Sequence, residues 1–203
     1  MARAPSLAGV ILAAGESSRM GRDKALLPWR GETFLTAAID SLRMSTELIM
    51  VVAGSNADVL RPVVDAAGVF LVVNPAPERG QFSSLQVGLQ EVLNRGRDAA
   101  MITLVDRPPL RRQTVAELRA AFDIAITQGK WAVVPEHDGK HGHPIVVARE
   151  MITAFLTAPV ETTARDVEHA HESRIQYVPV DDPLVIANID TPADYQQITA
   201  RAT

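Results

Sequence analysis

A stretch near the N-terminus, Leu12 to Lys24, concentrates glycines, hydroxyls and cations directly after a short apolar run. It reads LAAGESSRMGRDK. Glycine lets the backbone turn sharply and bring its N–H groups close to a ligand, while Arg19 and Lys24 supply positive charge. These residue types in this order indicate phosphate binding. Five residues separate Gly15 from Gly21, so the spacing fits neither a P-loop nor the dinucleotide-binding pattern G-x-G-x-x-G.

Two aspartates that follow apolar runs later in the chain are candidates for binding a metal ion. Asp106 follows residues 99–105 and is itself followed by prolines that end a strand, and Asp190 stands just before a helix start. Two carboxylates at strand ends can share Mg²⁺, which keeps several waters and bridges phosphate oxygens. Taken singly, Asp106 has the alternative of a turn carboxylate and Asp190 that of a helix N-cap.

The N-terminal stretch resembles the signature L-A-A/G-G-x-x-x-R-M-G-x-x-K of the nucleotidyltransferases that build the dinucleotide forms of the molybdenum cofactor. Four later segments match further motifs of that family in the family's order. They are Asn74 to Leu89, Leu104 to Pro108, Gly142 to Pro144 and Asn188 to Tyr195. Five motifs in the same order are hard to obtain by chance. Because they run from Leu12 to Tyr195, the resemblance covers almost the whole chain.

The resemblance implies roles for particular residues. Residues implied to bind the nucleotide are Leu12, Ala13, Ala14, Gly15, Arg19, Lys24, Ser84 and Asp106. Arg19, Lys24 and Asp106 are implied to be catalytic, and Asp106 and Asp190 are implied to bind Mg²⁺. Gly142, His143 and Pro144 are implied to lie near the acceptor. From the residues alone, Ser83 or Ser84 could instead cap the helix that follows.

The substrates implied by the resemblance are a nucleoside triphosphate and a phosphorylated pterin, molybdopterin, with pyrophosphate released. Ala14 stands where guanylyltransferases tend to have glycine, so the resemblance favours CTP over GTP. Three departures leave parts of this open. Arg107 replaces the more usual Gln or Met, residues 162–166 match the cytidylyltransferase pattern G-D-x-G-A-R only in part, and Asn188 replaces the usual Asp.

Other functions remain as alternatives. A guanylyltransferase of the same family is one, and a sugar-phosphate or methylerythritol-phosphate nucleotidyltransferase shares the glycine-rich start. A nucleotide-binding module without turnover, acting as a delivery partner, is the alternative outside enzymes. The resemblance also implies transient contact with a molybdoenzyme or its chaperone.

The elements that must position these residues alternate between apolar strands and amphipathic helices, which predicts a mostly parallel sheet covered on both faces. We expect one nucleotidyltransferase domain over residues 1–203, with a three-layer, Rossmann-like α/β fold and an antiparallel edge after a turn at 137–140. Predicted strands are 10–13, 48–53, 69–73, 99–105, 131–135, 144–148, 175–180 and 185–189. Predicted helices are 34–42, 58–67, 83–93, 115–127, 150–156 and 164–171, with a last helix opening at Thr191.

Composition limits the partners. The formal net charge of −4 argues against a nucleic-acid or anionic-membrane surface. No apolar stretch approaches the roughly 20 residues of a membrane span. The chain has no cysteine, which excludes disulfides and thiolate metal sites and fits a reducing compartment. We therefore expect a cytoplasmic protein, with the first apolar residues serving as a buried strand rather than a signal peptide.

Overall fold

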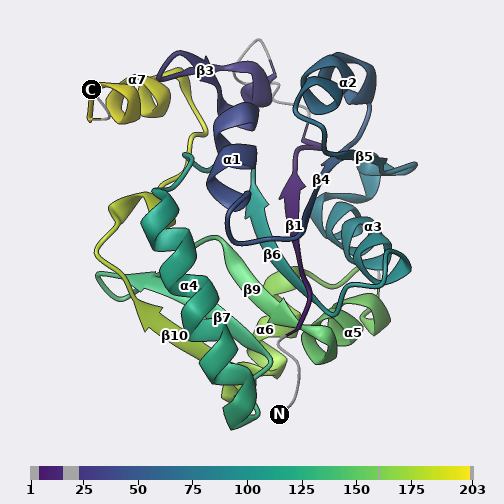
Figure 1. The fold of residues 1–203 in the computed structure, drawn as a ribbon. Coiled ribbons are helices and arrows are strands. Elements are labelled where there is room, and N and C mark those ends of the chain that lie inside the picture. Colours follow the sequence, from purple (N-terminus) through teal and green to yellow (C-terminus); the bar gives the residue numbers. More distant parts are fainter. Residues whose placement is uncertain (1–4, 16–22, 160, 202–203) are drawn as a thin grey trace.

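The computed structural model describes residues 5–15, 23–159 and 161–201 of the chain, and Figure 1 shows their fold. Within these residues one sheet contains eight strands, with the order β10-β7-β9-β6-β1-β4-β5 and with β8 paired to β7. The strands of this sheet are β1 (Leu7–Leu12), β4 (Leu48–Ala53), β5 (Phe70–Val73), β6 (Ala99–Leu104), β7 (Ala132–His137), β8 (Lys140–His141), β9 (Ile145–Ala148) and β10 (Ile175–Pro179). A separate hairpin consists of β2 (Pro28–Trp29) and β3 (Glu32–Thr33).

Helices cover both faces of the sheet because the buried strands are apolar on both sides. The helices are α1 (Phe34–Leu42), α2 (Ala57–Ala66), α3 (Gln81–Asn94), α4 (Arg112–Ala125), α5 (Arg149–Thr157), α6 (Ala164–Ala170) and α7 (Pro192–Arg201). Strand β1 shows the alternation: Leu7 and Ile11 pack with α1, α2 and α4, whereas Val10 and Leu12 pack with α3 and α5. The three-layer α/β fold predicted from the sequence is confirmed.

Helix α3 lies very close to the middle of the sheet. A Cβ atom on Gly88 would stand 2.8 Å from Val52 Cγ2 and 3.0 Å from Val10 Cγ1. Glycine at this position therefore lets the helix approach β1 and β4, and it fixes where the first turn of α3 lies relative to the ends of those strands.

The antiparallel pairing is confirmed, but its place in the sheet differs from the prediction. Asp138 and Gly139 have φ values of 49° and 71° and form the turn between β7 and β8. Strand β9 then pairs antiparallel with both β6 and β7, so it lies inside the sheet and not at its edge. The sequence pattern shows the turn, but not which neighbours the following strand selects.

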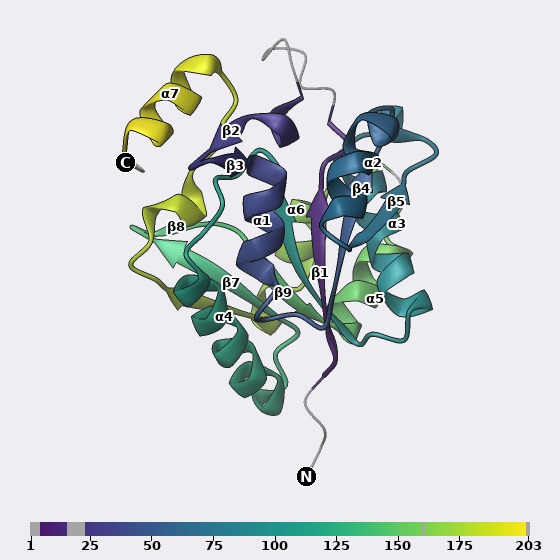
Figure 2. The ribbon, with the colours of Figure 1, turned by 45° about the horizontal axis from the view of Figure 1, so that its top comes forward.

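The predicted strand at 185–189 is wrong. Residues Pro183–Ile186 form a short 3-10 helix, which the side chain of Asp182 caps by accepting a hydrogen bond from the Leu184 amide at 3.1 Å. Proline fixes φ in the helical range, and the segment packs across the sheet end instead of joining it. The last helix, α7, begins as predicted after Thr191 and lies beside the β2–β3 hairpin in Figure 2.

No helix among the described residues is long and apolar enough to cross a membrane.

Candidate active site

Three distant segments bring Lys24, Asp106 and Asp190 to the same end of the sheet. Strands β1 and β6 are parallel and in register, with Leu12 opposite Leu104, so the segments that follow them leave the sheet side by side. The amide of Ile189 donates to the carbonyl of Asp106 at 2.9 Å, which draws in the segment that carries Asp190. Lys24 Nζ then lies 3.3 Å from Asp190 Oδ1. The predicted convergence of these residues is observed.

One carboxylate oxygen of Asp106, Oδ1, is buried without a hydrogen-bond partner among the described residues. Burial raises the pKa of Asp106; the cations Lys24 and Arg107 oppose that rise, and Asp190 adds to it. An unpaired buried carboxylate oxygen costs free energy, so its persistence beside a second carboxylate points to a cation as its partner.

Asp106 and Asp190 are the side chains that could hold a divalent metal ion. Carboxylate oxygens are the ligands that Mg²⁺ prefers, and the unpaired Asp106 oxygen fits such an ion. Within the described ranges no group of three or more His, Asp or Glu side chains could form a closed metal site. A metal here would therefore need water and substrate oxygens to complete its coordination.

Arg107, the departure from the family motif, supports the segment that carries Asp190. Its Nη1 donates to the carbonyl of Ala187 at 3.3 Å, while its Nε is buried without a described partner. Burial lowers the pKa of Arg107, and the neighbouring Asp106 and Asp190 oppose that effect. The guanidinium thus ties the 187–190 segment to the end of β6 and adds positive charge behind the carboxylates.

Asn56 fastens the loop that follows β1, and sequence reasoning gave it no such role. Its Nδ2 donates to Ala13 O at 2.9 Å and to Asp23 Oδ2 at 2.6 Å, and its Oδ1 accepts from the Gly54 amide at 3.0 Å. It therefore holds both ends of the segment that contains Arg19, a predicted site residue outside the described residues. The sequence could have indicated this role, because Asn56 follows β4, and the end of β4 lies beside the end of its parallel neighbour β1.

The backbone groups of Leu12 and Ala13 are engaged within the protein. Leu12 O accepts from the Val105 amide at 3.0 Å, and the Ala13 amide donates to Val52 O at 2.8 Å. No described residue forms a hydrogen bond with the backbone of Ala14 or Gly15. The nucleotide contacts predicted for this loop remain predictions.

Ser83 and Ser84 do not precede α3 but lie in its first turn, so neither is its N-cap, which is Gly80. Asn74 Nδ2 donates to both hydroxyl oxygens at 2.9 Å. Ser84 is 2% exposed, so its hydroxyl is committed to fixing the helix start against the loop after β5. Binding of the nucleotide by Ser84 remains a prediction.

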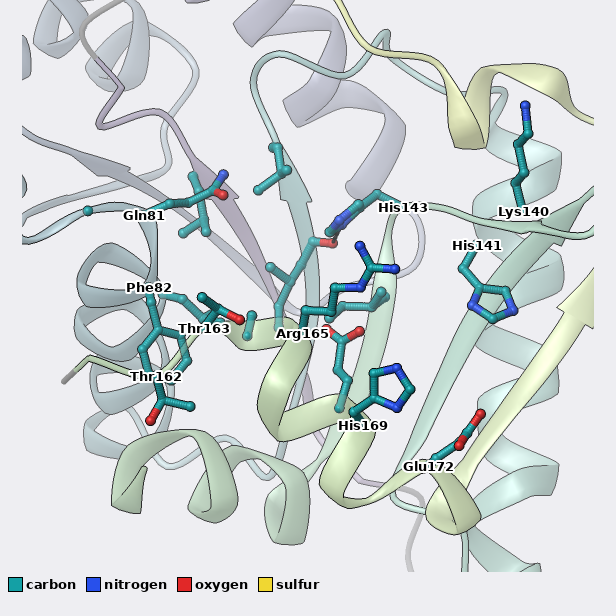
Figure 3. A pocket seen from close by; sticks show the side chains of 18 of the residues that line it. Gln81, Phe82, Lys140, His141, His143, Thr162, Thr163, Arg165, His169 and Glu172 are labelled. Atoms are coloured by element: carbon teal, nitrogen blue, oxygen red, sulfur yellow. Dashed lines mark hydrogen bonds between the residues drawn. The ribbon is translucent and has the colours of Figure 1, made fainter. Parts of the chain in front are cut away.

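A cavity of about 960 Å³ opens beside the ends of β1 and β6 (Figure 3). Its floor is apolar, and its walls come from the start of α3, the β7–β9 connection and α6. The floor residues are Leu12, Leu85, Ile102, Leu104 and Ile145. Figure 3 shows Gln81 and Phe82 on one wall, Lys140 and His141 on another, and Arg165 and His169 of α6 between them. Leu104 is two residues before Asp106, so this part of the cavity lies near the end of β6 that Asp106 follows, although neither aspartate lines it.

The Gly142–Pro144 loop is fixed from both sides. Gly142 donates its amide to Pro135 O at 2.9 Å, and a Cβ atom there would collide with the carbonyl of Val185. The His143 amide donates to that same Val185 carbonyl at 2.9 Å. Only glycine fits this approach, which explains the motif in physical terms.

His143 lines the cavity as a neutral ring at pH 7. Burial, with a further contribution from the Arg107 cation, lowers the pKa of His143 to about 4. Its Nδ1 lies 3.4 Å from the carbonyl of Ile102, and since a carbonyl can only accept, Nδ1 carries the hydrogen. A ring with so low a pKa is a weak base near neutral pH.

Residues 162–166, the partial motif match, also border the cavity. Thr163 is the N-cap of α6, and its side chain and that of Asp166 form a capping box. Asp166 is thereby engaged away from the cavity, whereas Thr162, Thr163 and Arg165 line it. Residues 162–166 therefore form the capped start of a short helix that borders the cavity.

Comparison with known proteins gives consistent results. The family model described as MobA-like NTP transferase domain matches residues 9–175. A molybdenum cofactor cytidylyltransferase from Escherichia coli (strain K12) is 28% identical over 195 residues, which cover 95% of this chain and 94% of that protein. A molybdenum cofactor guanylyltransferase from Xanthomonas euvesicatoria pv. vesicatoria (strain 85-10) is 36% identical over 196 residues, covering 94% and 93%. The crystal structure of Rv0371c from Mycobacterium tuberculosis H37Rv has a TM-score of 0.79 at 24% identity, covering 96% of this chain and 98% of that one, and shows the same fold.

Proposed function

We propose a specific reaction on the premise that the chain belongs to the family of MobA-like NTP transferase domains and is a nucleotidyltransferase. In this reaction, a nucleoside monophosphate, CMP in preference to GMP, passes from the triphosphate to the terminal phosphate of molybdopterin. The observation that carries the proposal is the meeting of Lys24, Asp190 and the unpaired Asp106 oxygen beside a large cavity.

The proposed step is an in-line displacement at the α-phosphorus. An oxygen of the acceptor phosphate forms the new bond to that phosphorus, the bond to the bridging oxygen breaks, and pyrophosphate leaves with its electron pair. Mg²⁺, held by Asp106 and Asp190 when bound, would neutralise phosphate charge. Lys24 stabilises the charge that develops on the equatorial oxygens, and Arg19 is proposed to assist it.

No protein base is required for this step. A phosphate monoester is already anionic at pH 7, so the attacking oxygen needs no proton removed. The low pKa of His143, about 4, agrees with a ring that shapes the acceptor cavity rather than one that accepts a proton. Gly142 and Pro144 are proposed to hold that ring in place.

The preference for CTP rests on the space around Ala14. A Cβ atom on the neighbouring Gly54 would stand 3.0 Å from Ala14 O and 3.3 Å from Ala14 Cβ, so the segments after β1 and β4 are already in close contact. The methyl group of Ala14 takes up space at this turn that a glycine would leave open, which favours the smaller pyrimidine base over a purine. Relatives of both specificities are similar to this chain, so the base is decided by local residues and not by overall likeness.

The test is pyrophosphate release from CTP, GTP, ATP and UTP, measured without acceptor, with molybdopterin, and with a sugar phosphate or methylerythritol phosphate, each in the presence and absence of Mg²⁺. We expect release that needs both molybdopterin and Mg²⁺ and that is fastest with CTP. Fastest release with GTP would identify a guanylyltransferase. Release only with a sugar phosphate or methylerythritol phosphate, or nucleotide binding without release, would contradict the proposed reaction.

A further inference from the structure

Glu168 is a carboxylate in the cavity wall that the proposed reaction does not use. It lies on α6 and lines the cavity together with Arg165 and His169 of the same helix. Its side chain is half-buried, and it forms no hydrogen bond or ion pair with another residue of the described chain. Arg165 and His169 act on it only through their charge.

Such a carboxylate is unfavourable in the empty protein. Burial raises the pKa of Glu168, and the charges of Arg165 and His169 only partly offset this. Partly removing a carboxylate from water without supplying hydrogen-bond donors costs free energy. Groups left in this condition on a cavity wall are candidates for contact with a ligand that brings the missing donors.

The surroundings define the ligand that would fit. The floor of the cavity is apolar, which suits a flat ring, and Phe82 in the first turn of α3 lines one wall. A carboxylate offers two parallel acceptors, so its best partner is an edge with two parallel N–H donors. A 2-amino-4-oxopyrimidine ring has such an edge, formed by the ring N–H and the amino group beside it. This ring is the head of a pterin.

We propose that Glu168 is the specificity-determining residue for the acceptor, accepting two hydrogen bonds from the ring N–H and 2-amino group of a pterin head. This proposal rests on the proposed function, because it assigns the end of the acceptor remote from the reacting phosphate. The ring lies on the apolar floor, and the phosphate extends toward Leu12 and Leu104, where the cavity lies near the end of β6 that Asp106 follows.

The experiment compares two soluble fluorescent probes, pterin-6-carboxylate and lumazine-6-carboxylate, which differ in the amino or oxo group at position 2. Each is titrated at pH 7 against the wild type and against Glu168→Gln, Glu168→Asp and Glu172→Gln. Glu172 lines the same cavity and is the matched control. The wild type is expected to bind the pterin on the order of ten-fold to a hundred-fold more tightly, as charge-assisted hydrogen bonds allow.

Glu168→Gln is expected to lose that preference, because an amide presents one acceptor and one donor to the pterin edge. Glu172→Gln should keep it, and Glu168→Asp should keep part of it. Thermal unfolding checks the fold, and Glu168→Gln should be at least as stable as the wild type because a half-buried carboxylate without a described hydrogen-bond partner becomes a neutral amide. Equal affinity of the wild type for both probes, or an unchanged preference in Glu168→Gln, would overturn the assignment.

Pyrophosphate release from CTP with molybdopterin is measured on the same samples. Absence of release in the wild type contradicts the proposed reaction. Normal release together with equal affinity for the two probes contradicts only the role of Glu168. The two failures are therefore distinguishable.

Discussion

At the scale of single residues, Lys24 is paired with Asp190 and, in the proposed reaction, supplies the cation that meets the developing phosphate charge. The Lys24 side chain is 14% exposed, so its charge is less screened than that of a surface lysine. We expect Lys24→Ala to lower kcat/KM by roughly ten-fold to a thousand-fold, the range found for electrostatic contacts of this kind. Steady-state kinetics with CTP and molybdopterin would measure this. Lys130→Ala, which removes a cation bonded to Ser173 O, is the control, and equal turnover in the two variants would remove Lys24 from the mechanism.

Two aspartates with different surroundings, Asp182 and Asp106, distinguish a stabilising carboxylate from a functional one. Asp182 accepts hydrogen bonds from Thr114 Oγ1 at 2.7 Å and from the Leu184 amide, whereas Asp106 Oδ1 has no described partner. Asp182→Asn should lower the free energy of unfolding by about 1–3 kcal/mol. Asp106→Asn should leave stability unchanged or higher but abolish turnover and weaken Mn²⁺ binding measured by electron paramagnetic resonance. A large stability loss in Asp106→Asn with normal metal binding would show that its carboxylate is structural.

His143 gives a prediction about pH. Its pKa of about 4 lies below that of an unfolded histidine, so the unfolded chain takes up a proton first as the pH falls. The stability that the folded protein gains from its neutral His143 is therefore complete above about pH 6.5 and is lost as the pH falls toward 4. Between pH 7 and pH 5 we expect a loss of about 2 kcal/mol in the free energy of unfolding. Urea unfolding of the wild type and of His143→Gln at a series of pH values checks it, because the variant should lose this part of the slope. Parallel pH profiles for the wild type and His143→Gln would contradict the assignment.

At the scale of elements, the close packing of α3 on the sheet positions the first turn that borders the cavity. Gly88→Ala would place a methyl group 2.8 Å from Val52 Cγ2, and overpacking of this kind costs roughly 1–3 kcal/mol. The gain of about 1 kcal/mol in helix propensity offsets part of it. The measurement is a double-mutant cycle with Val52→Ala. We expect Gly88→Ala to be less damaging in the Val52→Ala background by about 1 kcal/mol or more, and strict additivity would contradict the packing argument.

The elements also show where sequence patterns suffice and where they fail. Helix 34–42 was predicted with its observed bounds, because the apolar periodicity and the Thr33 cap act locally. Residues 185–189 are as apolar as a strand, yet they pack over the sheet end, and no local pattern reveals whether a strand finds a free edge. Strand β9 was placed at the sheet edge for the same reason: neighbours in a sheet are decided by contacts between distant segments.

The same division holds in the candidate site. The proximity of Lys24 and Asp106 could be predicted because the ends of parallel strands share one edge of a sheet, whereas Asp190 follows a 3-10 helix and is drawn in by the hydrogen bond from the Ile189 amide to Asp106 O. The hydrogen bonds of Asn56, Arg107 and Asn74 could not be predicted, since each is made to a segment far away in the sequence.

At the scale of the whole molecule, the arrangement separates two tasks around the ends of β1 and β6. In the proposed reaction, phosphate chemistry belongs to Lys24 and the two aspartates, and the nearby cavity between α3, α6 and the β7–β9 connection offers an apolar floor for a ring. The net charge of −4 means that the molecule as a whole does not attract anions. Phosphate binding must therefore come from a few local cations, which makes the reaction sensitive to single charge changes near the site.

The central claim, transfer of a nucleoside monophosphate to a phosphorylated acceptor, is tested most directly by the mass of the product. The protein is incubated with CTP, Mg²⁺ and molybdopterin, and the acceptor is analysed by mass spectrometry while pyrophosphate is measured in parallel. We predict one new species, the acceptor joined to one CMP through a diphosphate, formed in equal amount to pyrophosphate. An acceptor of unchanged mass, or pyrophosphate released without the joined product, would contradict the account.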